Sequence, residues 1–189
     1  MCETSAMPAI RNILSVSALL VLMVQTLAYP ALAQNSSDYP AAAFAAGRKA
    51  FDEERYPEAH HLFEEACNGG QPGGCFNFGL MVDYGIATEP NPLRARTFYR
   101  LACDGEIPSG CRYLGARLRE NDPKDPELAV YYLGRACTLG DAEGCFLAGY
   151  LHRIGEGTAK DEGIALDYFI QACEQNYQLA CDELRPKLR

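Results

Sequence analysis

The chain has 189 residues and is acidic, because 25 aspartate and glutamate residues outweigh 17 lysine and arginine residues to give a net charge of −8. A negative charge of this size repels phosphate backbones and anionic lipids, which argues against binding to nucleic acid or to a membrane surface. The length is that of one domain with a modest core.

Residues 1–33 have the organisation of a bacterial signal peptide. Arg11 provides a positive start, residues 13–27 are apolar, and residues 31–33 (Ala-Leu-Ala) match the small-residue pattern of a cleavage site. The alternative is a retained membrane anchor, since residues 13–33 are about long enough to span a bilayer. We expect cleavage, and export of the mature chain to the periplasm or out of the cell.

Removal of the signal also removes Cys2, so that nine cysteines become eight. An even number of cysteines in an exported chain is typical of a complete set of disulfides. The eight form pairs whose members are eight positions apart, at steps of 36, 34 and 36 residues: Cys67/Cys75, Cys103/Cys111, Cys137/Cys145 and Cys173/Cys181. A period in this range indicates a solenoid of helix-turn-helix units.

The segment before the first cysteine of each pair has the pattern of an amphipathic helix, which we name helix B. Small residues stand eight positions and one position before that cysteine, and bulky apolar pairs stand five and four positions before it. The alanines are Ala59, Ala95, Ala129 and Ala165, then Ala66, Ala102, Ala136 and Ala172; the pairs are Leu62-Phe63, Phe98-Tyr99, Tyr132-Leu133 and Tyr168-Phe169.

Capping residues predict where helix B begins and ends. Its starts are marked by Asn91-Pro92, Asp125-Pro126 and Asp161-Glu162. Its ends are expected at residues that accept the left-handed backbone conformation, namely Gly70, Gly140 and Asn176, with Gly105 one position earlier in its unit.

A second helix, helix A, is predicted to start near the second cysteine, at Gly74-Cys75, Gly110-Cys111 and Gly144-Cys145. Glycine recurs four residues later, at Gly79, Gly115 and Gly149. Because glycine inside a helix costs up to about 1 kcal/mol relative to alanine, its recurrence at one position implies close contact with a neighbouring helix. Helix A is predicted to stop at Gly85, Asn121 and Gly155.

The sequence therefore predicts an all-α, right-handed α/α superhelical solenoid with one disulfide per repeat. Gly47, Phe51, Tyr56, Ala59 and Phe63 fit a first, tetratricopeptide-like hairpin with a tight turn at Tyr56-Pro57. We expect a disordered lead-in over 34–40 and a repeat domain over 41–189, with units at about 41–70, 73–105, 109–140 and 143–176 and a closing helix over 179–188 stopped or kinked by Pro186.

Each cysteine pair is expected to tie the end of one helix B to the start of the next helix A. Zinc sites and thiol-disulfide catalysis call for cysteines much closer in sequence, so a structural role is the better interpretation. His60 and His61 point to different sides of a helix, and with His152 they are the only histidines. We expect solvated or capping roles for them, no metal and no cofactor.

The Ala-Cys and Gly-Cys blocks from Ala66 to Gly79, Ala102 to Gly115 and Ala136 to Gly149 resemble the Sel-like repeat (SLR) family of the tetratricopeptide clan, in its cysteine-rich secreted branch. In the last block the pattern departs, with Ala180-Cys181 in place of Gly-Cys. The resemblance covers residues 45–182 and implies a scaffold that binds proteins. Members catalogued as penicillin-binding proteins or β-lactamases imply that activity too, but the mature chain has only Ser36, Ser37 and Ser109 and no Ser-x-x-Lys or Lys-Thr-Gly motif.

We therefore expect an extracytoplasmic adaptor that binds a protein or peptide in the groove of the solenoid, with β-lactam binding or hydrolysis and a structural envelope role as alternatives. Three positions of helix A, two, six and nine residues after its cysteine, are candidates to face that groove. They are Asn77, Met81, Tyr84, Tyr113, Arg117, Glu120, Leu147, Leu151 and Ile154. Ordinary packing between helices is the competing interpretation of the same residues.

Overall fold

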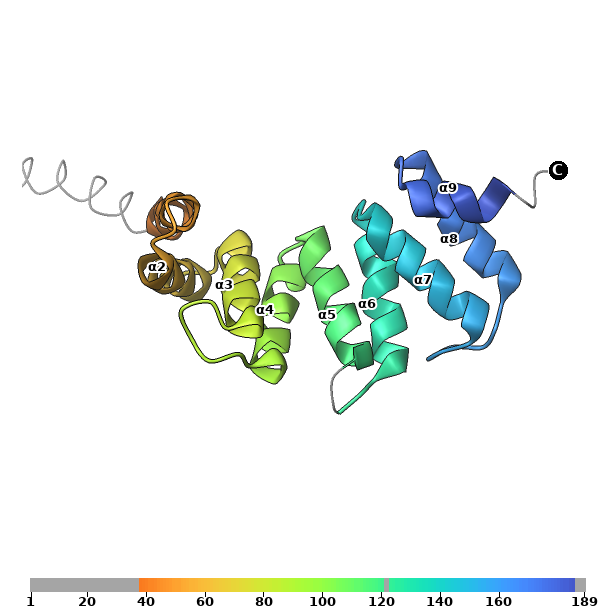
Figure 1. The fold of residues 1–189 in the computed structure, drawn as a ribbon, viewed down its shortest axis with the longest axis horizontal. Helices are drawn as coiled ribbons and strands as arrows, with labels where there is room; N and C mark the ends of the chain where they lie inside the picture. The colour runs from red at the N-terminus through yellow and green to blue at the C-terminus, as the bar shows by residue number, and fades with distance from the viewer. Residues whose placement is uncertain (1–37, 121–122, 186–189) are drawn as a thin grey trace, which may run out of the picture. The chain divides into compact units, whose positions relative to one another are not determined.

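The computed structural model describes residues 38–120 and 123–185. The chain divides into two units, Met1–Asp38 and Tyr39–Arg189, and the second carries the repeats. The predicted signal peptide, Asn121 and Pro186 lie outside the described residues. All regular structure within those ranges is helical (Figure 1).

Helices A and B alternate along the chain and pack side by side as successive hairpins (Figure 1). Residues 38–52 form the first helix A. The later A helices are α3 (Pro72–Tyr84), α5 (Pro108–Glu120) and α7 (Ala142–Ile154), and the B helices are α2 (Tyr56–Asn68), α4 (Pro92–Asp104), α6 (Pro126–Thr138) and α8 (Glu162–Glu174), followed by α9 (Gln178–Leu184). The prediction of an all-α solenoid of helical hairpins is confirmed.

The core is built from the repeated small and bulky positions of helix B. All eight alanines of the pattern are fully buried, and the bulky residue four positions before each cysteine is at most 2% exposed: Phe63, Tyr99, Leu133 and Phe169. A β-carbon added to Gly79, Gly115 or Gly149 would lie 2.9, 2.8 or 2.9 Å from Tyr99, Leu133 or Phe169 respectively. These glycines therefore let each helix A lie directly against the bulky residue of the helix B that follows it.

Four disulfides join the hairpins in the predicted pairing, from the end of one helix B to the start of the next helix A. Their Cα–Cα distances are 4.4 Å for Cys67–Cys75, 4.5 Å for Cys103–Cys111, 4.4 Å for Cys137–Cys145 and 4.8 Å for Cys173–Cys181. Each lies within the range that disulfide geometry requires. Every junction between successive hairpins from α2 onward is thus covalently bridged.

The predicted caps of helix B are confirmed. The side chains of Asn91, Asp125 and Asp161 each accept a hydrogen bond of 2.9 Å from the backbone N–H three residues later. Asp141, which the sequence analysis did not single out, caps α7 in the same way through the N–H of Gly144, at 2.7 Å. These bonds satisfy donors that a helix start otherwise leaves unpaired.

Each helix A begins two residues before the Gly-Cys pair near which it was predicted to start. α3 and α5 begin at Pro72 and Pro108, where a fixed φ and a missing N–H suit the first turn of a helix. At the other end, Gly85 and Gly155 adopt positive φ values of 72° and 73° and terminate α3 and α7 as predicted.

Two expectations about the first hairpin are wrong. Of the lead-in expected to be disordered, residues 38–40 are helical, and the Tyr39 hydroxyl donates a 2.9 Å hydrogen bond to Glu65 of α2. The tight turn lies at residues 53–55, where Glu54 has a φ of 58°, rather than at Tyr56-Pro57, which form the first turn of α2. Proline in that position starts the helix instead of making the turn before it.

The described residues contain most of the predicted closing helix, as α9. α9 ends at Leu184, which is buried together with Ala180 against the last hairpin. Arg185 is the last described residue, so the predicted extension to residue 188 lies outside the described residues.

The residue three positions after the first cysteine has a left-handed backbone in every repeat. Gly70, Gly140 and Asn176 have φ values of 83°, 91° and 65°, as predicted. The assignment of Gly105 in the second unit is wrong, since its φ is −83° and Glu106 carries the positive φ of 61°. Gly105 serves packing instead, because an added β-carbon would lie 2.3 Å from the ring of Pro72.

We predict that Glu106→Gly stabilises the protein by about 0.5–1 kcal/mol, because it relieves a left-handed conformation that costs a residue with a β-carbon about 1–2 kcal/mol. Gly105→Ala, one position away, is the matched control and should destabilise it through the contact with Pro72. Urea unfolding followed by circular dichroism measures both changes. A stability gain from Gly105→Ala, or a loss from Glu106→Gly, would contradict this explanation of the turn.

Candidate functional site

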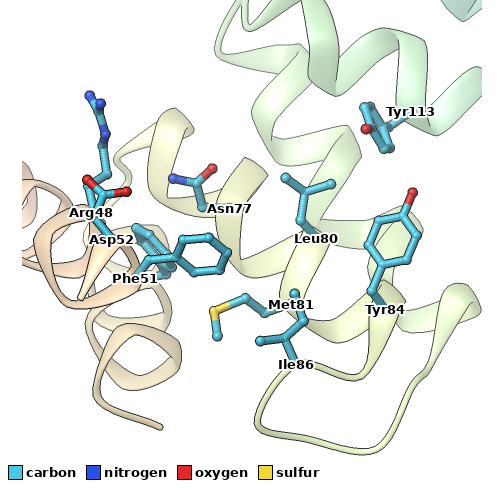
Figure 2. A pocket seen from close by; sticks show the side chains of 10 residues that line it. Arg48, Phe51, Asp52, Asn77, Leu80, Met81, Tyr84, Ile86 and Tyr113 are labelled. Carbon is cyan, nitrogen blue, oxygen red and sulfur yellow. The ribbon is translucent and has the colours of Figure 1, made fainter. Parts of the chain in front are cut away.

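A pocket of about 330 Å³ opens on the surface formed by three successive A helices (Figure 2). One wall consists of Arg48, Phe51 and Asp52 from the first helix. The opposite wall is formed by Tyr84 and Tyr113, from the end of α3 and from α5. Asn77, Leu80, Met81, Phe63 and Ile86 complete the lining, which is mainly apolar. Its volume is at the lower end of the about 300–1,000 Å³ typical of ligand sites.

The structure gathers four of the candidate groove residues around this pocket: Asn77, Met81, Tyr84 and Tyr113. Arg117 and Glu120 lie beside it, since Arg117 donates hydrogen bonds to Glu120 at 2.8 Å and to the Tyr84 hydroxyl at 3.3 Å. Whether any of these residues binds a partner is a proposal that we take up below.

Two of the candidate groove residues are buried between helices, which agrees with the alternative that they serve packing. Met81 and Leu151 are each 1% exposed and belong to hydrophobic clusters. Leu147 is partly buried against the same cluster as Leu151, and neither lines the pocket. Met81 is therefore a core residue that reaches the pocket floor, whereas Leu147 and Leu151 pack in a separate cluster of α6, α7 and α8 and do not line this pocket.

Arg48, Asp52, Leu80 and Ile86 also line the pocket, although none of them was predicted to do so. Gly47 stands in the first helix where Gly79 stands in α3, because an added β-carbon at either would collide with the bulky residue of the next helix B. Counting from these glycines, Arg48 corresponds to Leu80, and Asp52 corresponds to Tyr84. Extending the predicted groove positions into the unit that lacks a leading cysteine would have found Asp52, but not Arg48, because Leu80 was not a predicted groove residue either.

Two opposite charges on the first wall have no partner among the described residues. Neither Arg48 nor Asp52 makes a side-chain hydrogen bond or ion pair anywhere in residues 38–120 and 123–185, although both are exposed and one helical turn apart. Asn77 likewise makes no side-chain hydrogen bond within the described part of the chain. Its amide offers both a donor and an acceptor toward the pocket.

A buried polar network supports the opposite wall. The carboxylate of Asp83, whose side chain is 2% exposed, accepts hydrogen bonds from the Tyr99 hydroxyl at 2.8 Å and from Arg117 Nε at 2.7 Å. Burial, followed by the hydrogen bond to Asp83, raises the pKa of Tyr99 above its usual value of 10.0. Burial by itself lowers the pKa of Arg117. The hydrogen bond to Asp83 and the negative charge of Asp83 have a larger, opposite effect, so the pKa of Arg117 is raised overall.

The guanidinium of Arg117 also contacts Tyr84 at the edge of the pocket. Its central carbon lies 5.7 Å from the centre of the Tyr84 ring, a cation–π distance, while Tyr84 itself is 56% exposed. Burial raises the pKa of Tyr113, and the neighbouring Tyr84 adds to the effect. The network thus fixes the position of an exposed aromatic ring at the mouth of the pocket.

The expectation of solvated or capping histidines is wrong for two of the three. The ring of His60 packs edge-on against Phe78 at 4.9 Å, and burial lowers its pKa. The ring of His152 stacks on Tyr168 at 5.7 Å. Both rings serve mainly as flat packing surfaces, whereas His61 is exposed and lies 3.4 Å from Glu65.

Two further properties apply to residues 38–120 and 123–185 only. No helix there has the length and apolar character that crossing a bilayer requires. No group of three or more histidine, cysteine, aspartate or glutamate side chains is placed there to hold a metal ion.

Bridged helical hairpins that present a continuous surface of A helices define a helical-repeat scaffold. A family model described as Sel1 repeat matches residues 47–71, 72–106, 108–141 and 142–177. The chain belongs to the Sel1 repeat family, and the resemblance to Sel-like repeats is confirmed.

Cytochrome c oxidase assembly factor 7 of Xenopus tropicalis is 34% identical over 112 residues, which are 55% of this chain and 48% of that protein. The chain thus spans about half the length of the curated relatives it matches. Among solved structures, cysteine-rich protein B of Helicobacter pylori is 28% identical with a TM-score of 0.52, over 74% of this chain and 95% of that one. A Sel1 repeat protein of Oxalobacter formigenes, 23% identical with a TM-score of 0.67 over 75% and 60% of the two chains, shows the same fold.

Proposed function

We propose that this protein is an extracytoplasmic scaffold that binds an extended segment of a partner protein at the pocket between its first three A helices. One observation carries the proposal: an apolar pocket whose rim holds an unpaired amide and two unpaired charges, Asn77, Arg48 and Asp52. Buried polar groups in proteins are normally satisfied, and exposed ones beside a hydrophobic pocket are suited to fix the orientation of a ligand.

The compartment is proposed from the disulfides and from the leader. Four bridges between successive hairpins are suited to an oxidising environment, and the apolar stretch before the repeats has the pattern of an export signal. A cysteine-rich protein is among the structural relatives, and a curated relative is named as an assembly factor, which supports a role in holding other proteins. The proposed scaffold would act outside the cytoplasm by contact rather than by chemistry.

Selection of phage-displayed random peptides on the oxidised protein tests this function. We expect one enriched motif, whose affinity falls about tenfold in Tyr84→Ala, because exposed aromatic rings at a pocket mouth commonly dominate binding. Tyr131→Ala is the matched control, since Tyr131 is 59% exposed on α6, outside the pocket, and Tyr84 is 56% exposed. It should change the affinity less than about twofold.

Two results would contradict the proposal: no enriched motif, or a motif whose binding Tyr84→Ala and Tyr131→Ala affect equally. Thermal unfolding of both variants identifies any loss that comes from misfolding.

A further inference from the structure

The pocket is asymmetric in its charges. Arg48 and Arg117 contribute two positive charges around it, and Asp52, Asp83 and Glu120 contribute three negative ones. On the wall of Tyr84, the guanidinium of Arg117 is already engaged by Asp83 at 2.7 Å and by Glu120 at 2.8 Å. Among the described residues around the pocket, the charges that remain available to a ligand are those on the wall of the first helix.

Of the two available charges, Asp52 is the better placed. Both side chains line the pocket, but Figure 2 shows the longer Arg48 side chain carrying its guanidinium away from the apolar side chains. The field of the whole chain acts in the same direction, since a net charge of −8 attracts positive ligands and repels negative ones.

The remaining lining determines what lies next to that positive charge. Leu80, Met81 and Ile86 provide an apolar floor, and Phe51 and Tyr84 are large exposed rings on the two sides, 37% and 56% exposed. A volume of about 330 Å³ suits one large side chain with its flanking backbone. Asn77 can then pair with a backbone amide of the same segment.

On the basis of the proposed function, we infer that the pocket takes a large apolar side chain, such as phenylalanine, that is flanked by lysine or arginine, and that Asp52 selects the basic neighbour. The aromatic rings bury the apolar side chain, and the carboxylate of Asp52 forms an ion pair with the flanking cation. The faces of Phe51 and Tyr84 also favour a nearby cation through cation–π attraction.

Three fluorescein-labelled heptapeptides test this inference, each with a central phenylalanine flanked on both sides by lysine, by serine or by glutamate. Fluorescence polarisation with the oxidised protein should show about three- to fivefold tighter binding of the lysine peptide than of the serine peptide, and the weakest binding for the glutamate peptide. The preference should shrink as salt is raised from about 20 to about 200 mM, because exposed charges are screened.

Asp52→Asn should reduce the preference for lysine to less than about twofold, while Arg48→Gln leaves it intact or increases it. Both side chains are exposed and unpaired, so neither change should alter the thermal midpoint. Tyr84→Ala should weaken all three peptides alike.

The possible failures are distinguishable. Equal affinities for the three peptides, all reduced by Tyr84→Ala, would overturn the selection by Asp52 and leave the scaffold function standing. Tightest binding of the glutamate peptide, abolished by Arg48→Gln, would overturn it in favour of an acidic partner. Binding of none of the three would overturn the aromatic anchor, and the phage selection would then decide the scaffold function. A dimer in sedimentation that Tyr84→Ala dissociates would show that the occupant is a second copy of the chain.

Discussion

Reduction of the four disulfides is expected to lower the thermal midpoint of the protein by at least about 10 °C. In the loop-entropy account, a bridge between cysteines eight residues apart contributes at most about 2.6 kcal/mol, so that four contribute up to about 10 kcal/mol. The whole stability of a domain is about 5–15 kcal/mol, and 1 kcal/mol corresponds to about 2–4 °C at this size. Even half the ideal contribution therefore dominates the stability of a thin repeat array.

The loss of stability should depend on which disulfide is removed. Cys103 and Cys111 are fully buried in the middle of the array, where they pack on Ala136, whereas Cys173 and Cys181 are partly exposed and hold only the short α9. Replacing the first pair by alanine should therefore cost clearly more than replacing the second. Circular dichroism melts of the two double variants, with and without reductant, measure the difference. A variant lacking Cys103 and Cys111 that melts within about 2 °C of the wild type would contradict the stabilising role.

Arg117→Met is the second change with a large expected effect, a loss of about 3–5 kcal/mol. It leaves the carboxylate of Asp83 buried without its positive partner, and a buried charge that loses its partner is costly. Tyr99→Phe should cost less, about 1.5–3 kcal/mol, because it removes one hydrogen bond to a charged group. Urea unfolding with an unchanged slope gives both values.

The repeat itself provides the control. At the position of Arg117 two of the other units have Met81 and Leu151, and the first has Lys49. At the position of Tyr99 the other units have Phe63, Leu133 and Phe169. The triple variant Asp83→Leu, Tyr99→Phe and Arg117→Met replaces the network with apolar residues, so it should recover most of the stability that Arg117→Met loses. Strictly additive losses in the triple variant would show that the three side chains are not coupled.

The triple variant also separates stability from binding. Because Arg117 holds the ring of Tyr84 at the pocket mouth, a stable triple variant should still bind peptides more weakly than the wild type. This agrees with the view that a buried polar network fixes geometry more than it adds stability.

The sequence was a sufficient guide wherever a residue's environment repeats. The positions of the alanines, of the bulky residues of helix B, of the glycines at Gly79, Gly115 and Gly149 and of the cysteine pairs all followed from one period of 34–36 residues. Each of these side chains meets the same neighbour in the next unit, so spacing alone identifies its role. The caps at Asn91, Asp125 and Asp161 were equally readable, because a cap needs only the next three residues.

The tertiary structure decided what differs between units. Sequence spacing put Arg117, Met81 and Leu151 at one position of helix A, yet Arg117 joins a network with Asp83 and Tyr99, while the other two fill the core. Likewise the left-handed residue of the second turn is Glu106 and not Gly105, since Pro72 at the start of the same repeat requires the glycine for space. The pocket is lined by side chains from three successive units, between residues 48 and 113, and the unpaired Asp52 is one of them. The repeated part of the fold can be predicted because equivalent residues recur in every repeat. The pocket could not be predicted in this way, because it is formed by side chains that differ from one repeat to the next.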